Sequence, residues 1–134
     1  MEECRSENSM MISLFVSLMA PIFVLPFSYA LYKRTPEKRN ALYGFRTKRS
    51  LKSQATWIYA NKFSGLLSMK ISLALFPISI PISLYALHVN KIETVSIFSI
   101  YIQLGIILIP TIAITQYNLK RKFDDNGQPL KKKL

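Results

Sequence analysis

The chain has 134 residues, of which 50% are hydrophobic and 19% charged, and its formal net charge is +11. A single cysteine excludes a disulfide framework, a single histidine excludes most zinc and catalytic-triad chemistry, and abundant Ile, Leu and Phe exclude a disordered chain. A mean hydropathy of +0.21 despite 18 Lys and Arg indicates long apolar runs separated by short basic segments, which is typical of a membrane protein.

Three apolar runs predict three membrane-spanning helices, at about residues 10–32, 66–89 and 95–117. The first and third runs each have 23 residues without a charged side chain. At about 1.5 Å per residue, each reaches roughly 35 Å, enough to cross a hydrocarbon core of about 30 Å. The second run contains Lys70, so its span begins either at Ile71 or near Leu66 with the lysine reaching back to the headgroups. We therefore expect an all-α membrane protein with one domain, residues 1–134.

Basic residues are distributed unevenly among the segments outside these spans. The connector at 33–65 and the tail at 118–134 together hold fifteen Lys and Arg, whereas the leader and the second connector together hold two. Because positive residues are retained in the cytoplasm, we expect a multi-pass protein of the cell membrane with its N-terminus outside and its C-terminus in the cytoplasm. Anionic lipid headgroups attract charges near span ends by about 1 kcal/mol each. We therefore expect lipid headgroups, and no nucleic acid, as partners of these charges.

Small and polar residues within the spans recur at helical spacing. At 100° per residue, the serines of each run fall on one face of its helix, and Gln103 shares the face of the serines in the third. Because such faces pack against neighbouring helices in lipid, we expect Ser68, Ser72 and Gln103 to lie at helix–helix contacts. Gln103 should bond to one of these serines or to its copy in a second subunit. A polar conduit is the less favoured alternative, since no span contains a carboxylate.

The first connector contains a bend at Gly44. This glycine lies between two aromatic residues and close to Arg46, which predicts a tight bend whose geometry needs no side chain at that point. Arg46 can stack on an aromatic ring, hold a lipid phosphate or tie the bend to Asn61. The bend is therefore a candidate for a binding role as well as a structural one.

A short helix is predicted after this bend. Either Ser50 or Ser53 can cap it, and apolar residues then recur at helical spacing over 51–62, with aromatic residues suited to a membrane interface. We expect a short amphipathic helix in the headgroup layer, which bends or runs straight into the second span.

These connector residues resemble the signature of a known family. Asn40 is followed by YGFRT at 43–47 and then by WIYANK at 57–62, with a serine in the spacer between them. The order and intervals, set between two hydrophobic spans, resemble those of the SdpI family of small bacterial membrane proteins. Members commonly place an acidic residue shortly before the tryptophan. Here the stretch SQAT at 53–56 is neutral, so an ion pair between such an acid and Arg46 is absent.

The resemblance implies immunity to a secreted antimicrobial peptide or toxin that acts at the producer's membrane, in some members coupled to signalling. It also implies a binding patch made of the signature residues, which are Asn40, Tyr43, Gly44, Arg46, Thr47, Trp57, Ala60 and Asn61. The resemblance thus implies a toxic peptide as a partner of the chain, whereas the position of the patch at the cytoplasmic surface suits lipid headgroups or an inner partner protein better. The alternative is a signalling or scaffold subunit whose basic connector recruits a cytoplasmic or membrane partner protein.

An enzyme is not expected, because the sequence has no intramembrane carboxylate, nucleophile–base pair or phosphate-binding loop. No metal or other cofactor is expected either. The cluster DDNG at 124–127 lacks the ligand spacing and the closing Glu of a calcium loop, and it predicts a turn after the third span. A three-helix bundle buries little area, which leaves a homo-oligomer or a larger complex open.

Overall fold

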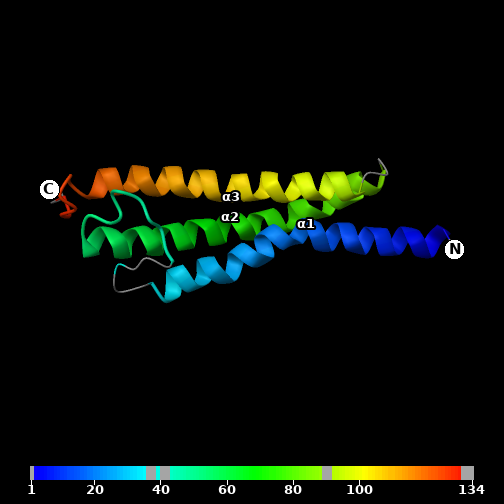
Figure 1. Ribbon diagram of the computed structural model, residues 1–134, viewed down its shortest axis with the longest axis horizontal. Coiled ribbons are helices and arrows are strands. Elements are labelled where there is room, and N and C mark those ends of the chain that lie inside the picture. Colours follow the sequence, from blue (N-terminus) through cyan, green and yellow to red (C-terminus); the bar gives the residue numbers. More distant parts are fainter. Residues whose placement is uncertain (1, 36–38, 40–42, 89–91, 131–134) are drawn as a thin grey trace.

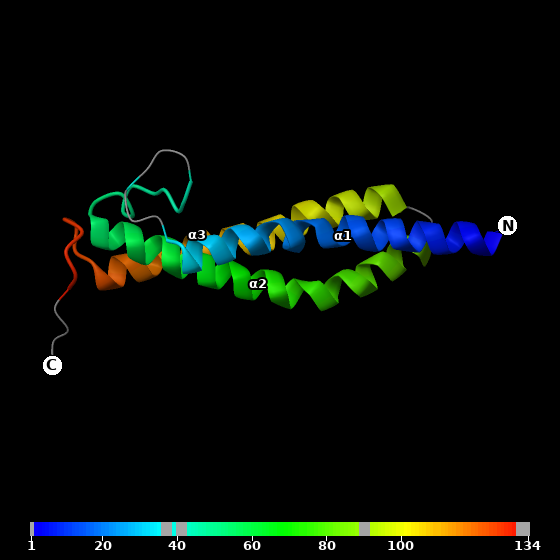
Figure 2. The same ribbon diagram turned by 90° about the horizontal axis from the view of Figure 1, so that it is seen from below.

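Three long helices make up the molecule. The computed structural model describes residues 2–35, 39, 43–88 and 92–130. Helices α1 (Glu2–Lys33), α2 (Gln54–His88) and α3 (Ile92–Lys122) lie side by side, and each runs antiparallel to the one before it (Figures 1 and 2). The N-terminus lies at one end of this bundle, which we call the N-terminal end. The segment between α1 and α2 lies beside the tail after α3 at the other end, which we call the connector end (Figure 1).

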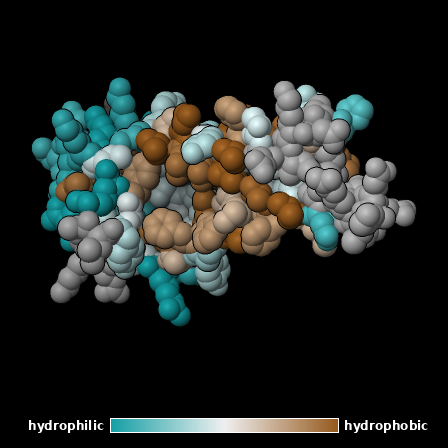
Figure 3. Space-filling view, turned by 45° about the vertical axis from the view of Figure 1, so that its right-hand side comes forward, coloured by the Kyte–Doolittle hydropathy of each residue, from teal (hydrophilic) through white to brown (hydrophobic). Residues whose placement is uncertain are grey.

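All three helices are long and apolar enough to cross a membrane. With 32, 35 and 31 residues, they extend over roughly 47–53 Å, more than a hydrocarbon core of about 30 Å requires. Hydrophobic side chains cover the middle of the bundle, whereas hydrophilic ones gather at the connector end (Figure 3). The expected all-helical architecture with three spans is therefore confirmed.

The short interfacial helix expected in the first connector is not a separate element. Its residues form the first turns of α2, which begins at Gln54 and continues without interruption to His88. The helix is continuous because the amphipathic segment and the apolar span that follows it both favour helix, and no proline or glycine interrupts residues 54–64. The alternative in which this segment runs straight into the span is thus the one observed.

Lys70 is an exposed residue of α2 and lies far from both ends of this helix. The hydroxyls of Ser28 and Ser68 are 2.7 Å apart, so Lys70 lies level with a part of α1 several residues before its end at Lys33. Helical side chains tilt toward the helix N-terminus, which for α2 is the connector end. This register favours a span that begins before Lys70, with the ammonium group extending toward the headgroups.

Serine hydroxyls join the helices inside the bundle. Besides the Ser28–Ser68 pair, Ser13 Oγ of α1 lies 3.2 Å from Ser96 Oγ of α3. Gly65 allows the closest approach of α1 and α2, because a Cβ atom there would lie 2.8 Å from the carbonyl oxygen of Ser28. Ser72 is fully buried but its hydroxyl has no hydrogen-bond partner. The small-residue faces of the three helices thus face one another, as their spacing predicts.

A proline explains the position of Gln103. Pro21 has no backbone N–H, so the carbonyl of Ser17, four residues earlier, loses its donor within α1. Gln103 Nε2 of α3 donates to this carbonyl at 3.1 Å, and the Ser79 hydroxyl of α2 lies 3.4 Å from it. Helix α1 changes direction in this middle part (Figure 1). Gln103 therefore bonds to the backbone of a serine on the predicted face, and the bond needs no second subunit.

Candidate functional site

The signature residues form a close contact between the connector and α2, which we call the connector lock (Gly44, Phe45, Trp57 and Asn61). The backbone N–H of Phe45 donates to Asn61 Oδ1 at 2.6 Å, and Asn61 Nδ2 donates to the carbonyl of Trp57 at 2.8 Å. Trp57 and Asn61 are both fully buried. The asparagine thus satisfies a loop amide and a helix carbonyl at once.

Gly44 makes this contact possible. Its φ is +118°, which disfavours residues with a side chain. A Cβ atom at this position would lie 2.5 Å from Asn61 Oδ1 and 3.0 Å from the Trp57 ring. The predicted tight bend at Gly44 is therefore confirmed. The Phe45 amide ties this bend to Asn61.

Ser50 closes the loop that follows the lock. Its hydroxyl accepts a hydrogen bond from the N–H of Thr47 at 2.8 Å and lies 2.7 Å from the carbonyl of Phe45, to which it can donate. The Ser50 N–H in turn donates to Thr47 Oγ1 at 3.3 Å. Ser50 is fully buried. Its hydrogen bonds to Phe45 and Thr47 fix the position of segment 45–47, which contains Arg46.

The cap of α2 is Ser53, one of the two serines considered from the sequence. The N–H of Thr56 donates to Ser53 Oγ at 3.1 Å, and the N–H of Ser53 donates to Thr56 Oγ1 at 2.9 Å. This reciprocal pair is a capping box in which threonine occupies the position that more often holds Glu or Gln. The neutral stretch at 53–56 therefore has a clear structural use.

The tail docks on the same connector through what we call the tail latch (Arg49, Lys52, Ser53, Asp125 and Gly127). Arg49 forms an ion pair with Asp125 at 3.0 Å, and Lys52 donates to the carbonyl of Asp125. The Ser53 hydroxyl donates to the carbonyl of Gly127 at 2.6 Å. A turn within the tail presents these acceptors.

Asp124 shapes that turn. Its side-chain Oδ1 accepts from the N–H groups of Asn126 and Gln128 at 2.9 and 2.7 Å, and Gly127 has a positive φ of 78°. The turn predicted at 124–127 is thus confirmed.

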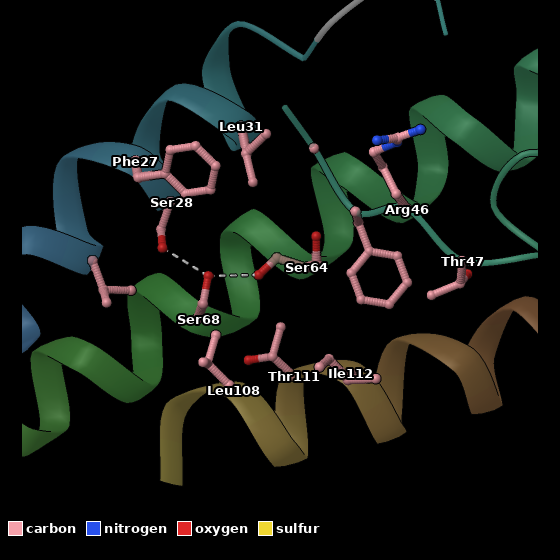
Figure 4. A pocket seen from close by; sticks show the side chains of 13 residues that line it. Phe27, Ser28, Leu31, Arg46, Thr47, Ser64, Ser68, Leu108, Thr111 and Ile112 are labelled. Atoms are coloured by element: carbon pink, nitrogen blue, oxygen red, sulfur yellow. Dashed lines mark hydrogen bonds between the residues drawn. The ribbon is translucent and has the colours of Figure 1, made fainter. Parts of the chain in front are cut away.

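Beneath the connector lock lies a cavity of about 320 Å³, which we call the connector-end cavity (Figure 4). The loop and all three helices contribute to its wall. The lining residues are Val24, Phe27, Ser28 and Leu31 from α1, residues 44–47 from the loop, Ser64 and Ser68 from α2, and Leu108, Thr111 and Ile112 from α3. The cavity is therefore the place where the signature loop meets the membrane-spanning bundle.

The hydroxyls of this cavity are engaged with the protein. Ser68 Oγ contacts both Ser28 Oγ at 2.7 Å and the Ser64 carbonyl at 2.8 Å, and Thr111 donates to the Ile107 carbonyl at 2.6 Å. The Arg46 guanidinium is directed away from α3 (Figure 4), and the residue is exposed. The wall is thus mostly apolar and its hydroxyls are already bonded within the protein, which suits an apolar ligand.

The structure divides the predicted patch into two groups. Trp57, Ala60 and Asn61 are fully buried in α2 and do not line the connector-end cavity. Trp57 and Asn61 support the loop through the connector lock. Gly44, Arg46 and Thr47 line the connector-end cavity, and Tyr43 is exposed. Asn40 lies outside the described residues.

Several cavity residues were not predicted as site residues. They include Phe45 and the hydroxyl-bearing residues Ser28, Ser64 and Thr111, together with the apolar lining residues of α1 and α3. Ser28 and Ser64 lie on the predicted packing faces, and this position was the sequence feature that could have identified them as cavity residues. Phe45 lies within the signature stretch at 43–47, and nothing local in the sequence distinguishes Thr111. Among the described residues, no group of three or more His, Cys, Asp or Glu is placed to hold a metal ion.

Comparison with known proteins gives one match. The model of the SdpI/YfhL protein family matches residues 37–114, which is more than half of the chain and includes the connector lock. No curated protein sequence and no solved structure matches the chain.

Proposed function

Because the chain belongs to the SdpI/YfhL protein family, we propose that it is an immunity protein that protects a membrane by binding a secreted antimicrobial peptide. Three membrane-spanning helices and the family signature support this assignment. Binding within the bilayer requires apolar surface together with a few fixed polar groups. The bundle offers both.

The observation that carries the proposal is the position of the connector-end cavity. The family's signature loop forms part of the wall of a cavity whose other walls come from all three spans. The connector lock and Ser50 hold that loop in place through partly buried hydrogen bonds. A ligand that enters from the membrane would therefore contact the loop and the helices together.

We further propose that the connector end faces the cytoplasm. The connector and the tail, which lie at the same end (Figure 1), hold fifteen Lys and Arg against two in the leader and second connector. Retention of positive residues in the cytoplasm then orients the chain. Exposed cations there would contact anionic lipid headgroups.

A second function, recruitment of a partner protein, is favoured by the tail latch. The Arg49–Asp125 ion pair and the Ser53–Gly127 hydrogen bond fold the connector and tail into one surface. Basic residues such as Lys48 and Lys62 remain exposed on the connector side. A folded basic surface of this kind suits a partner with an acidic patch.

The test of immunity is expression in a sensitive strain that is then challenged with culture medium of the source strain. We expect expressing cells to survive and cells with Arg46→Ala to lose protection at equal membrane levels. Lys48→Ala is the matched control, because it removes an exposed cation two residues away that lies outside the cavity.

If cells with Arg46→Ala are still protected, immunity does not depend on this residue of the signature loop. Absence of protection by the unmodified chain, together with capture of a protein through residues 33–62, would favour the recruiting function instead.

A further inference from the structure

One charged side chain, that of Lys70, lies on the outer surface of a membrane-spanning helix. Lys70 is an exposed residue of α2, inside the part of this helix that is apolar enough to cross a membrane. It is also the only Lys, Arg, Asp or Glu within the three apolar runs of the sequence. A charge inside a membrane span is costly and is normally paired with an opposite charge. Lys70 therefore requires a counter-ion.

The contact between α1 and α2 gives the depth of Lys70. The hydroxyls of Ser28 and Ser68 are 2.7 Å apart. Helix α1 ends at Lys33, five residues after Ser28, whereas Lys70 lies two residues from Ser68 in the direction away from that end. At about 1.5 Å per residue, the Cα atom of Lys70 is roughly 10 Å deeper than the end of α1. The exposed residue Lys62 gives a similar value, since it precedes Lys70 by eight residues, or about 12 Å.

Two aromatic rings lie on the side of α2 toward which Lys70 extends. At 100° per residue, Tyr59, Phe63 and Lys70 fall within about 40° on the helix surface, and helical side chains tilt toward the N-terminus of their helix. The rings of Tyr59 and Phe63 are stacked with centroids 5.7 Å apart. Lys122 Nζ lies 4.7 Å from the centroid of the Tyr59 ring. We call these four residues the lysine–aromatic face, which has a cation at each end and two rings between them.

The chain itself does not supply a counter-ion for Lys70. None of its seven Asp and Glu lies between residues 38 and 92. Lys70 forms no hydrogen bond and no ion pair with the residues that the structure describes. A second copy in the same orientation would hold its acidic residues at the same levels in the membrane, away from Lys70. The negative charge must therefore come from the lipid or from another molecule in the membrane.

An anionic phospholipid has the chemistry that this face requires. Its phosphate provides the negative charge, and snorkelling of the lysine with local thinning of the bilayer brings the two groups together. Its acyl chains suit the apolar surface next to Lys70, where Leu73 is 64% exposed. The aromatic rings suit the region between headgroups and acyl chains. Soluble anions do not enter this region, because an isolated charge is costly to transfer from water.

We infer that the lysine–aromatic face binds an anionic phospholipid, whose phosphate is held by the ammonium group of Lys70 and whose acyl chains lie against α2. The lipid is bound deeper than its neighbours in the same leaflet. None of the four residues of this face lines the connector-end cavity. The site is thus separate from that cavity, and the inference does not depend on the proposed function.

The test measures which lipid lies next to Lys70. A Leu73→Trp reporter is placed in the full chain, and brominated phosphatidylglycerol or brominated phosphatidylcholine in mixed vesicles quenches its fluorescence. Trp57 is fully buried, and its signal is subtracted by use of the chain without the reporter. The ratio of the two quenching curves gives the local preference for the anionic lipid.

We expect phosphatidylglycerol to be preferred at this reporter and Lys70→Met to reduce the preference about fivefold. Lys70→Arg should retain it, because a guanidinium also binds phosphate. Lys48→Met is the matched control, since it removes an exposed cation of the connector that lies outside the spans. An Ile109→Trp reporter on α3, where Ile109 is 70% exposed, should show no dependence on Lys70. Circular dichroism checks that each variant keeps its helix content.

A preference that Lys70→Met leaves unchanged, or that Lys48→Met lowers equally, would overturn the inference. An equal loss at the Ile109→Trp reporter would also overturn it, because the effect would then be general to the surface. Capture of a Leu/Ala helix with one Glu at this depth, in phosphatidylglycerol vesicles and lost in Lys70→Met, would identify a carboxylate as the counter-ion instead. The measurement uses neither a toxin nor cells, so its result is independent of the immunity test.

Discussion

The two ends of the bundle are held together by different kinds of contact. At the connector end, short hydrogen bonds join the loop, α2 and the tail, as in Phe45–Asn61 at 2.6 Å and Ser53–Gly127 at 2.6 Å. Toward the N-terminal end, the contacts between helices are longer, as in Ser83–Ser17 at 3.4 Å, and an apolar cleft separates parts of α2 and α3. This difference predicts that the connector end is the more stable half of the bundle.

Truncation of one aromatic residue at each end would test this difference most strongly. Trp57→Ala should lower the free energy of unfolding by about 3–5 kcal/mol, because it empties a fully buried site beneath Gly44. Phe98→Ala, in the cleft wall, should cost less than about 1 kcal/mol, since Phe98 is 63% exposed. SDS-induced unfolding in detergent micelles measures both values. Equal losses would show that the two ends are equally well packed.

A smaller effect is expected from adding a methyl group to a glycine. Gly44→Ala should destabilise the chain by about 1–3 kcal/mol, because alanine at a φ of +118° is strained and its Cβ would meet Asn61. Gly105→Ala, in α3, is the control. Its Cβ would meet only Ile109 Cδ1, at 3.9 Å, and alanine favours helix. The same unfolding assay should show Gly105→Ala to be neutral or stabilising. A neutral Gly44→Ala would contradict the close contact described for the connector lock.

The smallest effect concerns the tail latch. Asp125→Ala removes an ion pair with Arg49 in which the aspartate side chain is 83% exposed, so it should cost about 0.2–1 kcal/mol at low salt. High salt should reduce the cost further, because it screens exposed charges. Asn126→Ala, in the same turn, provides the control. A loss that is large or independent of salt would show that the latch contributes more to the framework than an exposed ion pair can.

Much of the connector lock was visible in the sequence, although its bonding was not. Gly44, Trp57 and Asn61 stand out because they belong to the signature stretches at 43–47 and 57–62 that the chain shares with its family. The role of Phe45 was hidden, because it is the backbone amide that bonds, and every residue other than proline has one. Likewise, Gln103 was recognised as a polar residue within a span, but its connection to Pro21 through the Ser17 carbonyl was not.

The sequence by itself determined the number of spans and the faces that pack together. These features follow from the length of the apolar runs and from their periodicity, both of which act over a few turns of helix. Only the tertiary structure decided which groups meet, namely Asn61 with the Phe45 amide, Gln103 with a carbonyl of α1, and the tail with the connector. The physical reason is that such contacts depend on the rotation and height of one helix relative to another. Ångström-scale differences in these quantities separate a hydrogen bond from an unpaired polar group.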